Sequence, residues 1–170
     1  MKRTNVKRLT LCALLTAIAL TIFVAEAQIP LPIPLPGFRL GLANIVTVYA
    51  MFAMGPADTL LILLSRIILG GLFAGGSTLP FSLAGGLCCY LSMLVLRKFL
   101  SLNQLWACGA IGAIFHNLGQ CLMAIAVYQA KQLILYYFPF IMVTGILAGF
   151  FTGLAAQFLL ARLGDRFKMQ

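Results

Sequence analysis

The sequence has very few acidic residues. Only three of its 170 residues are acidic, namely Glu26, Asp58 and Asp165, and charged residues of both signs make up 9% of the chain. The three acids lie in separate segments, so the sequence lacks the clustered carboxylates that hold Mg²⁺ against a diphosphate. The chain has a single histidine with no carboxylate near it in sequence, so no Ser/His/Asp set is readable. These absences argue against an enzyme.

Sequence motifs for common cofactors and partners are also missing. There is no G-x-x-x-x-G-K-[ST] loop, so ATP binding by a Walker motif is not expected. The net charge is +9, but no basic face carries interleaved aromatics, which argues against nucleic acid as a partner. No metal site, disulfide or cofactor is predicted, because no cysteine pair has ligand spacing and each lies in an apolar run; they are Cys12, Cys88, Cys89, Cys108 and Cys121.

What the sequence has in abundance is apolar residues. They make up 62% of the chain, and the mean hydropathy is +1.05. A soluble domain could not bury that much apolar surface, so the composition predicts an integral membrane protein whose partner is the lipid bilayer. We expect one all-α domain over residues 1–170, a bundle of six transmembrane helices at about 9–28, 40–54, 59–74, 81–96, 105–127 and 135–161.

The positive charges lie between the spans and indicate an orientation. With the N-terminus inside, the outer segments hold only Arg39 and Lys131, whereas the inner segments hold nine cations. This positive-inside bias predicts that both termini are cytoplasmic. The inner cations are Lys2, Arg3, Lys7, Arg8, Arg97, Lys98, Arg162, Arg166 and Lys168.

The first apolar run has two interpretations. Residues 25–27 have the small-x-small form of a signal-peptidase site, so a cleaved signal is one of them. The apolar stretch 9–25 is longer than the usual core of a signal peptide, which favours a retained helix.

Two spans carry rows of small residues. Ala13 and Ala17 are one turn apart on the first span, and Gly145, Gly149 and Gly153 repeat every four residues on the last. Such rows let another helix approach closely.

The sequences of two connections between spans predict their backbone conformation. Residues 29–37 have proline at every second position, which favours an extended form that serves either as a lid over a pocket or as a stiff connector. Residues 55–58 predict a tight turn, with Asp58 as the N-cap of the third span.

The fifth span carries the most unusual polar group. His116 and Gln120 are four residues apart and share one helix face, and Asn117 lies about 100° round from His116 and close to Gln120. Polar groups at this membrane depth are costly unless they face protein or water, so they point to a functional site.

Polar residues of other spans are expected at similar depths. Glu26 ends the first span, Arg39 and Asn44 begin the second, and Arg66 lies near the middle of the third. A cavity open to the outside and closed below would satisfy them together with His116. Structural roles stay open: Arg66 pairing with Glu26, His116 bonding a carbonyl, and Asn44 joining helices.

Three motifs in order resemble a known family. RLGLANIVT at 39–47, SLAGG at 82–86 and HNLGQ at 116–120 resemble the Gx transporter family, often labelled heptaprenyl diphosphate synthase component I. That family is similar in size and six-helix layout to the S components of energy-coupling factor (ECF) vitamin transporters. The resemblance implies a ligand site that opens outward beneath the loop between the first two helices. It also implies that Ala13 and Ala17 match an Ala-x-x-x-Ala groove that docks a coupling subunit.

These observations lead to a functional expectation. We expect a non-enzymatic subunit of the bacterial plasma membrane that captures a small, vitamin- or cofactor-like solute and works with separate coupling and ATP-hydrolysing subunits. Two alternatives are an accessory subunit of isoprenoid or quinone synthesis or of flavin-based extracellular electron transfer, and a solitary transporter. The expected substrate-binding residues are Arg39, Asn44, Arg66, His116, Asn117, Gln120 and Glu26.

Overall fold

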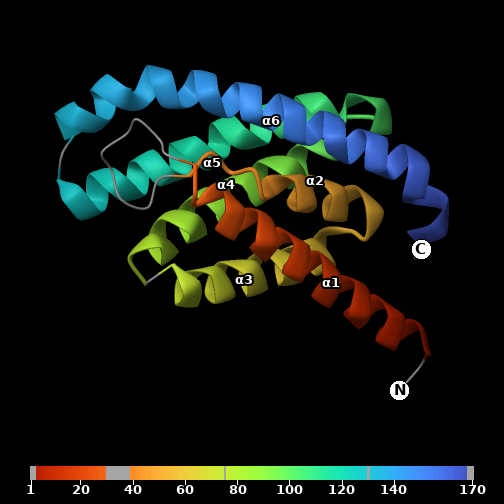
Figure 1. The fold of residues 1–170 in the computed structure, drawn as a ribbon. Helices are drawn as coiled ribbons and strands as arrows, with labels where there is room; N and C mark the ends of the chain where they lie inside the picture. Colours follow the sequence, from red (N-terminus) through yellow and green to blue (C-terminus); the bar gives the residue numbers. More distant parts are fainter. Residues whose placement is uncertain (1–2, 30–38, 75, 130, 168–170) are drawn as a thin grey trace.

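A computed structural model describes residues 3–29, 39–74, 76–129 and 131–167. The proline-rich segment at 29–37, expected to be a lid or a connector, lies outside the described residues from residue 30 on. The described chain is all-α, as predicted from its composition. Its helices are α1 (Arg3–Glu26), α2 (Asn44–Ala53), α3 (Pro56–Phe73), α4 (Leu79–Leu96), α5 (Leu105–Tyr128) and α6 (Lys131–Phe167), with short 3-10 turns at Gly76–Thr78 and Leu102–Gln104 (Figure 1).

Five helical segments are long and apolar enough to cross a membrane: Val6–Glu26, Pro56–Phe73, Gly76–Leu96, Leu102–Tyr128 and Leu135–Leu163. The predicted second span differs, because its helix α2 has only 10 residues. At 1.5 Å per residue α2 is about 15 Å long, roughly half of the hydrocarbon thickness. The structure therefore supports five membrane-spanning helices and one short helix.

The short helix α2 lies in the centre of the bundle. It contacts each of the five other helices. Most of its residues are buried, from Asn44 at its first position to Met51. Because α2 is enclosed by protein, the polar side chain at its start is kept away from lipid.

Helices α5 and α6 lie side by side along one edge of the bundle (Figure 1). Their contact uses glycines from both helices. A Cβ on Gly109 or Gly153 would collide with the backbone of the facing helix, and one on Gly149 would lie 2.6 Å from the Ala113 side chain. The predicted close-packing role of the glycine row on the last span is confirmed.

The start of α3 differs from the sequence prediction. The N-cap is Gly55, with φ of 103°, and the helix begins at Pro56, so Asp58 lies in the first turn and is not the cap. Proline is favoured at the first helical position because its missing N–H would be unpaired there. Both Asp58 oxygens instead accept hydrogen bonds from Nε of Arg8, at 2.8 and 2.7 Å, which ties α3 to α1.

Candidate functional site

Polar side chains from four helices and one loop are buried within this apolar bundle. Relative exposures of 5% or less are found for Glu26, Asn44, Arg66, His116 and Gln120. Arg39, in the loop before α2, is partly buried. We call these six residues the polar cluster. Burial of so many polar groups is costly unless each finds a partner.

Glu26 anchors the loop that precedes α2. Its Oε1 and Oε2 accept hydrogen bonds from the backbone N–H groups of Gly41 and Leu42, both at 2.8 Å. Gly41 has a φ of 81°, which favours glycine, and a Cβ there would lie 2.7 Å from Nδ2 of Asn44 and 3.2 Å from the His116 ring. The loop backbone therefore passes directly between Asn44 and His116.

Arg39 joins the same loop to α1 and α5. Its backbone N–H donates to Oε1 of Gln120 at 3.3 Å, and its Nη1 donates to the carbonyl oxygen of Phe23 at 3.1 Å. Its guanidinium lies over the Phe23 ring, with Cζ 4.3 Å from the ring centre, as in a cation–π contact. The side chain is cationic near neutral pH, because arginine keeps its proton in proteins.

His116 and Gln120 contact each other, as their shared helix face predicted. Nε2 of His116 and Nε2 of Gln120 are 3.1 Å apart, so the amide donates to the ring and the histidine carries its proton on Nδ1. Nδ1 has no hydrogen bond of good geometry to a described residue, although the Gly85 backbone lies beside it. A Cβ on Gly85 would lie 2.9 Å from both His116 and Gln120.

Arg66 forms no salt bridge in the described part of the chain. Its Nε and Nη2 atoms are buried and form no hydrogen bond there. The pairing with Glu26 considered from the sequence is not formed among these residues, because Glu26 binds the loop instead. The Arg66 guanidinium lies near the Phe23 ring, at 5.8 Å from its centre, and Nη2 would lie 3.8 Å from a Cβ on Gly86.

The two asparagines differ in their contacts. Both amide atoms of Asn44 are buried and unpaired within the described ranges. Asn117 instead donates from Nδ2 to the carbonyl oxygen of Ile141 at 2.8 Å, and this amide occupies the space left by Gly145 on α6. The hydrogen bond of Asn117 is thus with α6, and no hydrogen bond joins it to Gln120 among the described residues.

Some neighbours of the polar cluster were not predicted as site residues. Gly41, Gly85 and Gly86 all lie inside the sequence motifs at 39–47 and 82–86, so those motifs carried the signal. Phe23, whose ring contacts both arginines, has no sequence signal, because an apolar residue in an apolar helix is unremarkable.

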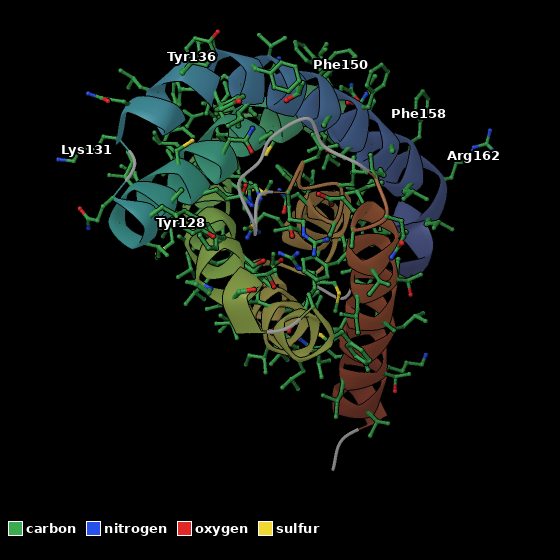
Figure 2. The ribbon with its side chains drawn as sticks, turned by 60° about the vertical axis from the view of Figure 1, so that its left-hand side comes forward. Tyr128, Lys131, Tyr136, Phe150, Phe158 and Arg162 are labelled. Atoms are coloured by element: carbon green, nitrogen blue, oxygen red, sulfur yellow. The ribbon has the colours of Figure 1, made fainter. Side chains whose placement is uncertain are left out.

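The predicted docking residues lie at the surface. Ala13 and Ala17 are both exposed on α1. Helix α1 also forms one wall of an apolar groove, together with α2 and α6. The lining of this groove includes Leu14, Ile18, Ile45, Tyr49 and Leu159. The outer face of α6 is apolar too, with Tyr136 and Phe158 pointing away from the bundle (Figure 2).

A helical bundle with apolar outer surfaces and a buried polar cluster defines the protein as a membrane-type helical protein. Residues 15–159 match the family described as heptaprenyl diphosphate synthase component I, and the chain belongs to that family. No curated protein and no solved structure matches the chain.

Proposed function

We propose that this protein is the substrate-capture subunit of an importer for a small, vitamin- or cofactor-like solute. One observation carries the proposal. Polar side chains from four helices and one loop converge in an apolar bundle, and some of their buried atoms lack partners among the described residues, on Asn44 and Arg66. Buried polar atoms of this kind are normally satisfied, so a polar solute is a natural partner for them.

The proposed topology has six crossings, with α2 completing its crossing through the loop before it, and both termini in the cytoplasm. In Figure 1 the first turn of α1 and the last turn of α6 lie on the same side, which supports an even number of crossings. Lys131 and Arg162 mark opposite ends of α6 (Figure 2). They are about 46 Å apart along the helix at 1.5 Å per residue, which matches a bilayer with its headgroups. The polar cluster would then open outward, away from Arg8 and Asp58.

In this proposal the protein has no catalytic role of its own. Coupling and ATP-hydrolysing subunits would supply the work, and the coupling subunit would dock on Ala13 and Ala17 in the bacterial plasma membrane. Their exposure on α1 leaves a surface where a partner helix can approach closely. A solitary transporter would instead take up solute when expressed alone.

The family description favours one rival, a membrane accessory subunit of isoprenoid or quinone synthesis. Such a protein would hold a prenyl lipid. The chain's three acids do not cluster in sequence, which supports the transport proposal over diphosphate chemistry.

The decisive experiment is native mass spectrometry of the protein purified from its membrane. We expect a bound water-soluble molecule in the wild type and none in the double variant His116→Leu/Gln120→Leu, at unchanged expression. Gln132→Leu, a change at an exposed residue of α6, is the matched control and should retain the molecule. A prenyl lipid in place of the soluble molecule, or equal occupancy in the double variant, would contradict the proposal.

A further inference from the structure

The charges of the polar cluster do not balance. Arg39 and Arg66 are cationic, because an arginine side chain keeps its proton in proteins, and Glu26 is the acid that accompanies them. Both oxygens of Glu26 already accept backbone N–H groups, and Arg39 is held by Phe23. A positive charge therefore remains on Arg66, inside an apolar bundle where an unpaired charge is most costly.

No described acid other than Glu26 lies in the polar cluster, and none forms a salt bridge with Arg66. The sequence contains only three acids. Asp58 is bound to Arg8, and Asp165 lies in the last turn of α6. The described residues therefore leave Arg66 without a carboxylate in salt-bridge contact, and a bound anion would supply that negative charge.

The unpaired atoms of Arg66 have the geometry of an anion-binding fork. Nε and Nη2 lie on one edge of the guanidinium plane, and their N–H groups point in parallel. These are the two Arg66 atoms that are buried without a hydrogen bond to any described residue. Two parallel N–H donors match the two oxygens of a carboxylate or two oxygens of a phosphate.

We propose that Arg66 is the anion-binding residue of the site and that the captured solute carries a carboxylate or a phosphate. That this anion is a transported solute rests on the proposed function. Arg39 adds a second positive charge beside the same Phe23 ring. Within the described ranges Asn44 offers an unpaired donor and an unpaired acceptor, so the solute also carries hydrogen-bonding groups of both kinds.

The test measures thermal unfolding in nanodiscs of phosphatidylcholine, with inorganic phosphate and acetate as probes. We expect the anions to raise the Tm of the wild type. Arg66→Gln should need at least about tenfold more anion for the same shift, or show no shift. Arg97→Gln, which removes an exposed arginine, is the matched control and should respond as the wild type does.

The baseline Tm separates an anion site from a structural role. Without added anion, Arg66→Gln should unfold at the same temperature as the wild type or higher, because it removes an uncompensated buried charge. A lower baseline with an unchanged anion response would overturn the proposal. Arg66→Lys, which keeps the charge but loses the fork, should show a weakened anion response.

Two further arms identify the source of the anion and isolate the proposed function. Nanodiscs that contain phosphatidylglycerol test a lipid headgroup; stabilisation by that lipid, with no effect of phosphate or acetate, would overturn the proposal. Uptake of the same two probe anions, phosphate and acetate, into cells that coexpress the coupling and ATP-hydrolysing subunits tests transport. Anion binding that depends on Arg66 without any uptake would contradict the proposed function and leave the anion site standing.

Discussion

At the residue scale, glycines set how closely the polar groups approach one another. Gly85 on α4 has no side chain, and His116 and Gln120 occupy that space. Gly41 does the same between Asn44 and His116. The geometry of the polar cluster thus depends as much on what glycine leaves empty as on the polar residues themselves.

We predict that Gly85→Ala weakens solute binding by about tenfold or more, which corresponds to 1.4 kcal/mol. The new methyl group would lie 2.9 Å from the His116 carbonyl oxygen, which cannot move without displacing α5. Binding to the purified protein is the measurement. Gly76→Ala is the matched control, since its Cβ would meet nothing within 4 Å, and equal effects of the two changes would refute the packing argument.

A second prediction concerns the loop anchor. Glu26→Gln replaces one acceptor oxygen by an NH₂ group that faces a backbone N–H donor of Gly41 or Leu42. We expect a loss of about 1–3 kcal/mol in unfolding free energy, because one buried donor is left unpaired. Denaturant unfolding in detergent measures it. Gln28→Ala, at an exposed position just beyond α1, should have no such effect, and a fully stable Glu26→Gln would show that the loop is held in another way.

The sequence identified the polar residues of the site more reliably than it identified their hydrogen-bond and salt-bridge partners. The sequence singled out Glu26 and Arg66 because ionisable groups are rare in spans. It left open whether they pair. The two residues form no salt bridge in the described structure. The Glu26 carboxylate instead accepts a hydrogen bond from the backbone N–H of Gly41.

At the element scale, α1 presents a surface of small side chains. Ala13 and Ala17 are exposed one turn apart, so a helix from another protein can pack closely there. This surface is separate from the polar cluster, which lies at the C-terminal end of α1.

We predict that Ala13→Leu/Ala17→Leu abolishes co-purification of the coupling and ATP-hydrolysing subunits and leaves solute binding unchanged. The larger side chains would hold the partner helix away from α1. Affinity purification followed by quantification of the partners is the measurement. Ala126→Leu, an exposed alanine on α5, is the control for added surface bulk. Partner recovery at the wild-type level in the double variant would remove this docking site.

Helix boundaries were predictable where the apolar pattern is long. The expected span at 105–127 corresponds to α5, Leu105–Tyr128. The helix within the expected span at 40–54 is only α2, which begins at Asn44. The residues before it form a loop whose backbone is hydrogen-bonded to Glu26. The short length of α2 could not be predicted from hydropathy, because it depends on the tertiary contact between this loop and Glu26.

At the scale of the whole molecule, charge asymmetry and helix lengths predict one orientation. Lys98 lies in the turn between α4 and α5, and Gln129 lies in the turn between α5 and α6. The proposed topology places these turns on opposite sides of the membrane.

We predict that a membrane-impermeant maleimide labels Gln129→Cys in intact cells and labels Lys98→Cys only after the cells are permeabilised. Both positions are exposed. The native cysteines are buried, or partly buried in the case of Cys88, so the wild type should give a low background. The reverse labelling pattern would invert the topology and place the polar cluster toward the cytoplasm.

By itself, the sequence determined the class of the protein, its helices and the identity of its rare polar residues. These properties are local, because a helix satisfies its own backbone and the bilayer accepts any apolar surface. Only the tertiary structure decided which polar atoms pair and which stay open. Arg39 and Gln120 are 81 residues apart, and their contact exists because α5 and the loop pack together. The open Arg66 fork has the same origin, since it depends on where Glu26 and Asp58 are held.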